Sequence, residues 1–382
     1  MIAKHIEQLA PSGIRQFFDL VLGMPDVISL GVGEPDFITP WRAREKAITA
    51  LEEGMTSYTS NKGLFVLRRA IAAFLEKKYS LSYDAEEEVL VTVGVSEGLD
   101  LALRAIIEPG DTVIVASPHF VAYPALVEIS GGKVLYLVTR QDEGFKINPS
   151  VLKKLLRENP KAIIFNNPAN PTGTTYTAKE LALLWKVLAP SCTLVISDEV
   201  YDELNYAGKP TPFATLAPAA RQRTILLNGF SKSYAMTGFR IGYACANKEI
   251  IDAMTKIHSF SMMCAPIVSQ VAATEALKAQ REVCQMRLEY KRRRDFMVRE
   301  LNRLRLLLSK PQGAFYCFAS IGNFKISSLE FAKRLLFEEK VAVVPGAAFG
   351  REFDSYIRMS YATSFDNLKE AIVRIERFLK KL

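Results

Sequence analysis

The fold is decided by seven short apolar runs: EVLVTV (88–93), DTVIVAS (111–117), KVLYLV (133–138), KAIIF (161–165), TLVIS (193–197), TILLN (224–228) and RIGYACA (240–246). Amphipathic or loop segments separate these runs along the chain. Short β-rich runs that alternate with helical patterns are typical of a largely parallel sheet covered by helices on both faces. We therefore predict an α/β fold, with a three-layer α/β/α large domain built on a mostly parallel seven-stranded sheet.

The pattern changes after about residue 280. A long charged helix is followed by a strand (GAFYCFAS), a helix (SLEFAKRLLFEEK), two strands (VAVVPG and YIRMSYA) and a terminal helix ending in FLKKL. This order predicts a second, smaller α+β domain that packs against the first with a cleft between them. We expect an N-terminal segment and lid over residues 1–45 that belongs with the small domain, a large domain over 46–280 and a small domain over 281–382.

The composition is that of a globular protein without a nucleic-acid partner. The chain has 382 residues and is 49% hydrophobic, which is enough for a large core. Its net charge of +8 is largely local, because residues 281–310 hold ten Lys/Arg and four Asp/Glu. Leucines and methionines keep helical spacing in that stretch, so we interpret the charges as a solvated helix face.

The N-terminus and the cysteines favour a cytoplasmic protein. MIAKHIEQLAPSG (1–13) lacks the apolar run of a signal peptide, and no segment reaches about 18 consecutive apolar residues. We expect neither secretion nor a membrane partner. The five cysteines have no CxxC spacing, so we expect reduced core residues and no metal site.

Two side chains that follow strands, Lys232 and Asp198, could carry a reaction. Partial burial of Lys232 in NGFSKSYAMTGFRIGY (228–243) would lower the pKa of its amine from about 10.4 and let the amine form an imine. Asp198 ends the strand in CTLVISDEVYDEL (192–204), where a buried carboxylate needs a positive partner such as a pyridinium nitrogen. Alternatively, Lys232 is a surface lysine in a loop, and Asp198 is an acid at a helix N-terminus.

The segment VTVGVSEGLDLALRAII (91–107) combines a strand, a glycine turn and an amphipathic helix. We expect Ser96 to cap this helix, and the free backbone amides of Val95, Ser96 and Glu97 could hold a phosphate. A capped helix after a strand is also common in α/β proteins that bind no phosphate at this position.

Three more residues could face a ligand. Two Asn-Pro steps in KAIIFNNPANPTG (161–173) stiffen a loop and can direct the Asn170 amide inward, although a rigid turn without a ligand has the same sequence. Arg358 in YIRMSYA can bind a carboxylate with two hydrogen bonds, or can form an ordinary salt bridge. In ISLGVGEPDF (28–37), Asp stands where a dinucleotide-binding motif needs its third glycine, so Gly33 instead predicts a close backbone approach to a ligand.

Together these segments resemble, in order and spacing, the class I (fold type I) aminotransferases that depend on pyridoxal 5′-phosphate (PLP), the aspartate aminotransferase family. The resemblance spans nearly the whole chain. It rests on GVGEPDF (31–37), YTSNKGLFVLR (58–68), VTVGVSEGLDLAL (91–103), NNPANPTG (166–173), SDEVYDEL (197–204), GFSKSYAMTGFRIGY (229–243), GAFY (313–316) and IRMSYA (357–362).

The resemblance implies a role for each residue around the cofactor ring. Lys232 would carry PLP as a Schiff base, and Asp198 would pair with the pyridine nitrogen. Asn170 and Tyr201 would donate hydrogen bonds to the phenolic oxygen, while Phe120 would stack on the pyridine face. Many family members have Trp or Tyr at the position of Phe120, so stacking is kept here and any hydrogen bond from that ring is lost.

The resemblance also implies how the phosphate and the substrate are held. Arg240, with the amides and hydroxyl around Val95, Ser96 and Glu97, would hold the phosphate. Position 229 is Gly where some members have a phosphate-binding serine, so Ser231 or Ser233 would compensate. The substrate α-carboxylate would be bound by Arg358 with Gly33 and Asn170. Tyr58 resembles a tyrosine that reaches the phosphate of the neighbouring subunit, which implies a homodimer with shared sites.

The implied reaction is a ping-pong transamination from an L-amino acid (aspartate, aromatic or related) to a 2-oxo acid such as 2-oxoglutarate, with Lys232 as general base and acid. One alternative is a PLP-dependent lyase or synthase on the same fold. Another is a ligand-sensing regulator, but the motifs begin near residue 28 and leave no room for a helix-turn-helix region.

Substrate choice is only partly indicated. IRQFFDL (14–20) and GMPDVISLGVGEPDF (23–37) resemble the prokaryotic aspartate and aromatic amino acid aminotransferases and the acetyl-diaminopimelate aminotransferases. We expect Ile14 to Phe18 to form part of a lid, in which Phe17 and Phe18 would favour apolar or aromatic side chains.

Overall fold

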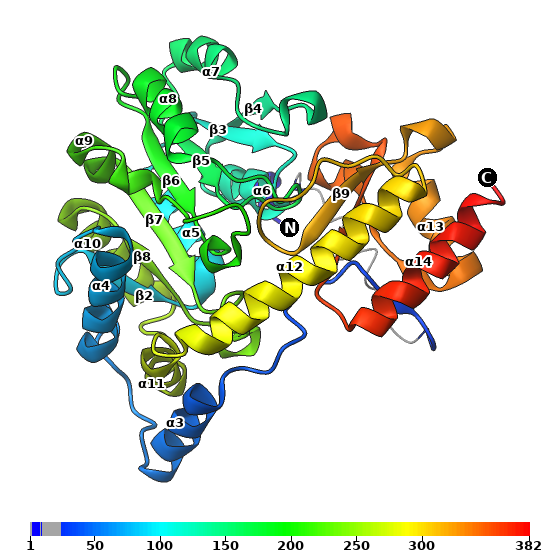
Figure 1. Cartoon of the computed structure of the whole chain (residues 1–382). Helices are drawn as coiled ribbons and strands as arrows, with labels where there is room; N and C mark the ends of the chain where they lie inside the picture. Colours follow the sequence, from blue (N-terminus) through cyan, green and yellow to red (C-terminus); the bar gives the residue numbers. More distant parts are fainter. Residues whose placement is uncertain (1, 8, 10–23) are drawn as a thin grey trace.

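A seven-stranded sheet forms the centre of the larger part of the computed structural model, which describes residues 2–7, 9 and 24–382 (Figure 1). Neighbouring strands are parallel except at β8, which is antiparallel to both of its neighbours. The predicted α/β fold with a mostly parallel sheet is therefore confirmed. In order across the sheet the strands are β2 (Val89–Thr92), β8 (Gly242–Cys245), β7 (Thr224–Gly229), β6 (Leu194–Asp198), β5 (Ala162–Asn166), β3 (Thr112–Ser117) and β4 (Lys133–Val138).

The central strands are buried on both faces, which explains why their sequences are continuous apolar runs. In β6, Val195 belongs to the hydrophobic cluster on one face and Ile196 to the cluster on the other. Leu226 and Leu227 of β7 divide between opposite faces in the same way. Side chains alternate across a strand, so two covering layers are needed, and the large part of the molecule has three layers.

Helices supply those two covering layers. One face packs against α5 (Gly94–Ile106), α6 (Ala122–Ile129) and α10 (Lys248–Ser261). The other face packs against α4 (Phe65–Tyr79), α7 (Pro149–Leu155), α8 (Ala178–Leu188) and α11 (Ile267–Ala276). The helix α3 (Trp41–Glu52) packs on α11 at the lower edge of Figure 1, and α9 (Pro218–Gln222) precedes β7.

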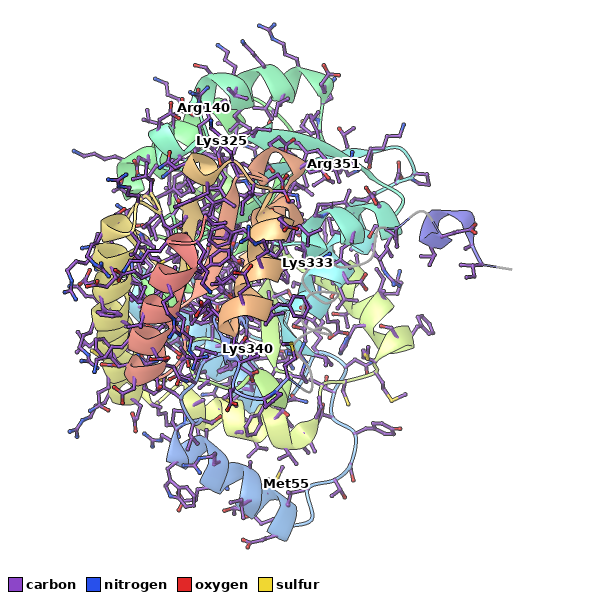
Figure 2. All side chains as sticks on the ribbon, turned by 90° about the vertical axis from the view of Figure 1, so that its right-hand side faces the viewer. Met55, Arg140, Lys325, Lys333, Lys340 and Arg351 are labelled. Atoms are coloured by element: carbon purple, nitrogen blue, oxygen red, sulfur yellow. The ribbon has the colours of Figure 1, made fainter. Side chains whose placement is uncertain are left out.

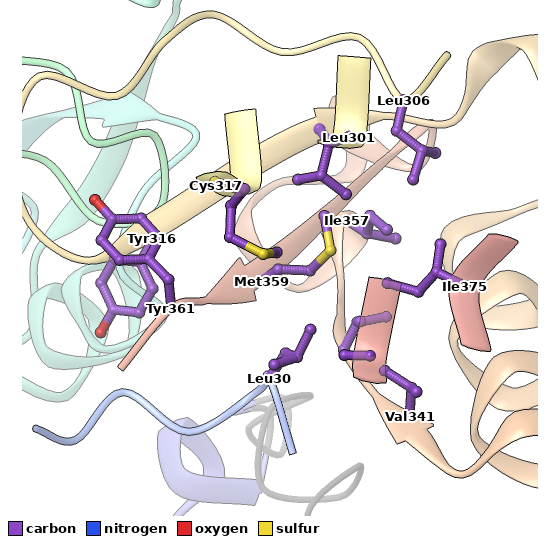
Figure 3. Close-up of a cluster of buried hydrophobic side chains, with 14 of the residues drawn as sticks. Leu30, Leu301, Leu306, Tyr316, Cys317, Val341, Ile357, Met359, Tyr361 and Ile375 are labelled. Atoms are coloured by element: carbon purple, nitrogen blue, oxygen red, sulfur yellow. The ribbon is translucent and has the colours of Figure 1, made fainter. Parts of the chain in front are cut away.

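A smaller α+β unit follows along the chain. Its sheet is antiparallel in the order β11 (Val344–Pro345), β12 (Tyr356–Ser360), β9 (Tyr316–Ser320). The helix α12 (Gln280–Arg303) runs from the end near α11 to β9, and α13 (Ser328–Glu339) and α14 (Phe365–Leu379) complete the unit (Figure 1). Figure 3 shows its core, where Leu301 of α12, Met359 of β12 and Ile375 of α14 meet.

The remaining elements are short. The strand β1 (Ile28–Ser29) pairs in parallel with β10 (Val341–Ala342), which joins the N-terminal segment to the C-terminal unit. The helix α1 (Lys4–Glu7) lies near the N-terminus. The short 3₁₀ helices are Gln141–Glu143, Leu156–Glu158, Asp202–Leu204, Phe213–Thr215, Thr237–Phe239, Gly322–Phe324, Gly346–Phe349 and Arg351–Phe353.

Two predictions about the C-terminal part need correction. VAVVPG is not one strand, because β10 and β11 belong to different sheets and the chain crosses between them at the buried Val343. The basic stretch is indeed a helix, but it is not only a solvated face: the side chains of Arg293 and Arg294 are 8% and 5% exposed. Arg293 forms ion pairs with Asp36 and Glu289, so this part of the charge is structural.

Other basic side chains lie away from α12. Figure 2 labels Lys325, Lys333 and Arg351, all exposed, on the face formed by the smaller unit. No helix among residues 2–7 and 24–382 is long and apolar enough to cross a membrane.

Candidate active site

The carboxyl ends of the central strands open into a cavity of about 260 Å³. Ligands bind open α/β sheets at this edge, and Asn166 of β5 and Asp198 of β6 are paired neighbours there. Eleven of the thirteen residues predicted from the sequence line this one cavity: Gly33, Val95, Ser96, Phe120, Asn170, Asp198, Tyr201, Ser231, Lys232, Arg240 and Arg358.

Asp198 is a buried carboxylate, and no cation of the described residues lies at hydrogen-bond distance from it. The Tyr123 hydroxyl donates to Oδ2 at 2.7 Å, and the Val200 amide donates to Oδ1 at 3.2 Å. Burial raises the pKa of Asp198, although these two donors and the nearby charge of Lys232 oppose the shift. A cation placed in the cavity beside Asp198 would favour its ionised form.

Lys232 lies in the turn after β7 and points toward the N-terminal segment. Its Nζ donates to the Gly33 carbonyl oxygen at 2.5 Å. Burial lowers the pKa of Lys232 to about 8, and the nearby carboxylate of Glu34 partly opposes the shift. A substantial fraction of the amine is therefore neutral, and nucleophilic, near neutral pH.

The N-terminus of α5 and Arg240 form a positive corner of the cavity. A Cβ on Gly94 (φ +78°) would lie 2.9 Å from Nη2 of Arg240, so only glycine lets the guanidinium approach the start of the helix this closely. The helix dipole and the guanidinium favour an anion at the same place.

The prediction that Ser96 caps this helix is wrong. Val93 is the capping residue, and its amide donates to the carboxylate of Glu97. Ser96 therefore lies inside the first turn, where its backbone amide belongs to the four that α-helices leave free, whereas the amide of Glu97 does not. The side chain of Glu97 instead pairs with Nδ1 of buried His258 at 2.7 Å, and Glu97 does not line the cavity.

The structure explains the glycine at position 229. Gly229 pairs with Gly242 in the sheet, and a Cβ on Gly229 would lie 3.0 Å from the Gly242 Cα and from a methyl group of Val95. A serine would fit there only if these neighbours moved by a few tenths of an ångström. Ser231 lines the cavity, whereas Ser233 does not and its buried hydroxyl has no partner among the residues described.

Arg358 is a buried cation with no carboxylate partner among residues 2–7, 9 and 24–382. It is 2% exposed, with Nη1 donating to Oδ1 of Asn170 at 3.0 Å and Nη2 donating to the Gly31 carbonyl oxygen at 2.6 Å. Its Nε has no hydrogen-bond partner in the described part of the chain. Burial lowers the pKa of Arg358 from its usual range, and no salt bridge within the described part of the chain compensates this cost. A guanidinium in this state can bind a carboxylate ligand.

Asn170 faces Arg358 with its carbonyl oxygen, which leaves its amide nitrogen for the cavity. Its own backbone amide donates to Oδ1 of Asn166 at 2.8 Å, and this bond holds the Asn-Pro loop against the end of β5. Phe120 also lines the cavity, and its ring meets that of Tyr123 edge to face.

Tyr58 is the second predicted residue outside the cavity. Its side chain is 81% exposed, and Tyr58 does not line the cavity of its own chain. Its predicted role in a neighbouring subunit stays a prediction. The lid expected over Ile14 to Phe18, with Phe17 and Phe18, lies outside the described residues.

Sequence reasoning missed two tyrosines of the site. Tyr123 follows Phe120 by one helical turn, but no local signal connects it with Asp198, 75 residues away. Tyr316 belongs to the GAFY motif and had received no role, although its hydroxyl lies 2.9 Å from that of Tyr201 and its ring lies against Arg358.

Comparison with known proteins identifies the family. The model of the family "Aminotransferase class I and II" matches residues 25–375. The aspartate aminotransferase of Pyrococcus abyssi is 40% identical over 100% of this chain and 98% of its own, and aromatic-amino-acid aminotransferase 2 of Thermococcus litoralis is 37% identical over 100% and 98%. The solved aspartate aminotransferase of Thermus thermophilus with maleate is 36% identical over 99% of both chains, with a TM-score of 0.94. The chain therefore belongs to the class I and II aminotransferases, and it is an enzyme that transfers amino groups.

Proposed function

We propose that this aminotransferase uses PLP, with Lys232 as its covalent attachment point. It would move an amino group from an L-amino acid such as aspartate or an aromatic amino acid to a 2-oxo acid such as 2-oxoglutarate, by ping-pong chemistry. One observation carries the proposal: one cavity is lined by a lysine with a lowered pKa and by a carboxylate and a guanidinium that have no oppositely charged partner among the described residues. Membership of a family that generally depends on this cofactor supports it.

The ring end of the cofactor matches Asp198 and its surroundings. A protonated pyridine nitrogen would supply the cation that this buried carboxylate lacks. When bound, PLP supplies an electron sink for the negative charge that develops at the substrate Cα. Asn170 and Tyr201 would donate to its phenolic oxygen, and Phe120 would cover one face of its ring.

The phosphate end matches the positive corner. The free amides of Val95 and Ser96 at the start of α5, the guanidinium of Arg240 and the hydroxyl of Ser231 would hold the phosphate. The close approach of Arg240 to Gly94 supports this assignment, because it brings the guanidinium to the positive end of the helix dipole, where one anion could contact both.

Lys232 and Arg358 would act on different parts of the substrate. Arg358 would bind the α-carboxylate, with Gly33 and Asn170 beside it, and so fix the direction of the Cα–H bond. The Lys232 amine would take the proton from Cα and later return a proton to the reacting centre as general acid. A pKa of about 8 suits both steps, because the amine gains and loses a proton near neutral pH.

The proposal extends to the assembly and to the domains. We propose a homodimer in which the exposed Tyr58 reaches the phosphate of the neighbouring site. The division into an N-terminal segment (1–45), a large domain (46–280) and a small domain (281–382) is supported by the pairing of β1 with β10. A cytoplasmic location is supported by the five cysteines, all of which are free thiols, although only Cys245 and Cys317 are buried in the core as expected and Cys192 is exposed.

The test is Lys232→Ala, with Lys325→Ala as a matched control at an exposed site far along the chain. Wild type and control should show the visible absorbance of bound PLP and form a 2-oxo acid from the amino donor. Lys232→Ala should lose at least about 10³-fold in transfer rate, because both the covalent attachment and the general base are removed. Transfer at the wild-type rate by Lys232→Ala would contradict the proposal.

The same assay separates transfer from elimination and identifies the donor. Ammonia and pyruvate released without a 2-oxo acceptor would indicate a lyase, whereas product formation that requires 2-oxoglutarate indicates transfer. Donors should include L-aspartate and L-phenylalanine. Among the described residues, the only cations that line the cavity are Lys232, Arg240 and Arg358. Each of the three already has a proposed role.

A further inference from the structure

We propose that Tyr316 is a positioning residue for two functional groups at once: its ring supports the guanidinium of Arg358, and its hydroxyl fixes the direction of the Tyr201 hydroxyl. This inference rests on the proposed function, which gives Arg358 the substrate carboxylate and Tyr201 the phenolic oxygen of PLP.

Tyr316 lies where the small sheet reaches the cavity. It is the first residue of β9 and pairs with Ser360 of β12, while Arg358 pairs with Phe318. Tyr316 and Arg358 are therefore diagonal neighbours on one face of the sheet. Tyr316 is 1% exposed yet lines the cavity, so its ring separates the apolar core from the site (Figure 3).

The ring of Tyr316 stabilises a cation that has no carboxylate partner. The Arg358 guanidinium carbon lies 4.4 Å from the centre of the Tyr316 ring and 5.0 Å from that of Phe349. A desolvated cation–π contact of this kind is among the stronger ones. Unlike a carboxylate, an aromatic ring holds the guanidinium without using any of its five N–H donors, so Nε stays available for a substrate.

The hydroxyl of Tyr316 meets the large unit. It lies 2.9 Å from the hydroxyl of Tyr201, which follows β6. It also lies against the backbone of Gly33, where an added Cβ would be 2.5 Å from the hydroxyl oxygen. Gly33 in turn accepts the hydrogen bond from Lys232, so one tyrosine adjoins three groups of the site.

The two hydroxyls can share only one hydrogen bond in one direction. Burial raises the pKa of both tyrosines, so each keeps its single proton. If Tyr201 donates that proton into the cavity, its oxygen must accept the proton of Tyr316. Without the Tyr316 hydroxyl, the Tyr201 oxygen loses the donor that polarises its O–H bond, so Tyr201 would be a weaker donor to the cofactor.

Three variants separate these two actions in the holoenzyme. Tyr316→Phe keeps the ring and removes the hydroxyl, and Tyr316→Leu removes both. Tyr201→Phe removes the hydroxyl that accepts the hydrogen bond from Tyr316. The control is Tyr361→Phe. Tyr361 is fully buried near Tyr316 in the same core, and its hydroxyl donates to the Ala314 carbonyl oxygen at 3.1 Å, away from the cavity (Figure 3).

The first readout is the pH midpoint of the visible absorbance of bound PLP. Loss of a donor to the phenolic oxygen should raise this midpoint, because the donor favours the form that carries more negative charge. Tyr316→Phe should raise it by a measurable part of the shift caused by Tyr201→Phe and should add nothing in the Tyr201→Phe background. A midpoint equal to that of Tyr361→Phe, or shifts that add in the double variant, would overturn the role of the hydroxyl.

The second readout is the Kd of maleate, a dicarboxylate that cannot donate an amino group. Tyr316→Phe should bind maleate within about twofold of wild type, and Tyr316→Leu about tenfold more weakly, because only the latter loses the cation–π contact. Equal loss in both variants would overturn the separation into two roles, as would wild-type binding by Tyr316→Leu. If Tyr316→Leu does not fold, the absorbance measurement with Tyr316→Phe decides the proposal. If wild type itself binds no PLP, the proposed function fails and not this inference alone.

Discussion

Two buried arginines, Arg293 and Arg358, hold the same N-terminal segment in opposite ways. Arg293 of α12 donates to both carboxylate oxygens of Asp36 at 2.8 Å and to Glu289 at 2.9 Å. Among the described residues, Arg358 of β12 has as its polar and aromatic partners the Gly31 carbonyl oxygen, the Asn170 side chain and two aromatic rings. One guanidinium is neutralised within the fold, and the other is not.

The difference shows how a structural charge can be told from a functional one. A buried cation with its carboxylates in place stabilises the joint it spans, and breaking it leaves buried charges unpaired. A buried cation held by neutral groups is costly for stability and is kept where a ligand supplies the missing anion. The contacts around each arginine predict different consequences for its loss.

The largest effect should come from Arg358→Gln. We expect kcat/KM to fall by about 10²- to 10³-fold, equivalent to roughly 3–4 kcal/mol, because the substrate carboxylate loses a paired, charge-assisted contact. The thermal midpoint should stay the same or rise, since an uncompensated buried charge is removed. Steady-state kinetics and thermal unfolding of the same preparations test both statements.

Arg358→Lys is the informative control for charge. Lysine keeps the positive charge but loses the planar fork, so we expect most of the loss to remain. Activity near wild type in this variant would mean that charge alone, and not geometry, is needed at this position.

Arg293→Gln should produce the opposite pattern. The free energy of unfolding should fall by about 3 kcal/mol, because Asp36 and Glu289 are left without their shared partner. In the folded enzyme kcat/KM should change little. A double variant that also carries Asp36→Asn should recover part of the lost unfolding free energy. Urea unfolding of the two single variants and the double variant measures the coupling between Arg293 and Asp36. Additive losses would show that the two groups do not interact.

The central sheet and one side of the site could be predicted from the sequence. The apolar runs gave β5, β6 and β7, and polar residues that follow parallel strands must share one edge, so Asp198, Asn170 and Lys232 were expected near one another. This inference needs only strand order and side-chain chemistry.

The rest depended on contacts that no local pattern encodes. Ser96 was wrongly taken as a cap because the helix begins two residues earlier, at Gly94. The side chain of Glu97 points toward His258, 161 residues away, because α5 packs against α10. From the sequence, Arg293 and Arg294 were expected on a solvated helix face. Their spacing along the helix contains no information about the distant segment around Asp36, which covers Arg293 in the fold. The role of Tyr58 needs a second chain.

Ligand binding sharpens the contrast between the two arginines. Maleate at about 30 times its Kd should stabilise the wild-type holoenzyme by about 2 kcal/mol, through binding to the folded state alone. Arg293→Gln, although less stable than wild type without the ligand, should gain the same stabilisation from maleate. Arg358→Gln should gain none at the same maleate concentration. Equal stabilisation of all three proteins in calorimetric melts would show that Arg358 does not bind the carboxylate.

Lys232 extends the comparison to a cation that can lose its proton, which arginine in practice cannot. Like Arg358, Lys232 donates to a carbonyl oxygen, and its Nζ has no carboxylate of the described residues at hydrogen-bond distance. Burial lowers its pKa to about 8 in the folded chain, below the value near 10.5 of an unfolded lysine. Between these two pH values the unfolded chain binds more protons, so this residue's contribution to stability rises with pH across that window.

The measurement compares the PLP-free wild type with Lys232→Met from pH 7 to 10.5, so that tyrosines and cysteines titrating in the same range cancel. The difference in unfolding free energy should move in favour of wild type by up to about 1 kcal/mol per pH unit above pH 8. The same comparison for Arg358→Gln should show no such slope, because the guanidinium stays charged throughout. A flat difference for Lys232→Met would mean that burial does not lower the pKa of this amine, and the chemistry proposed for it at neutral pH would then depend on the bound cofactor alone.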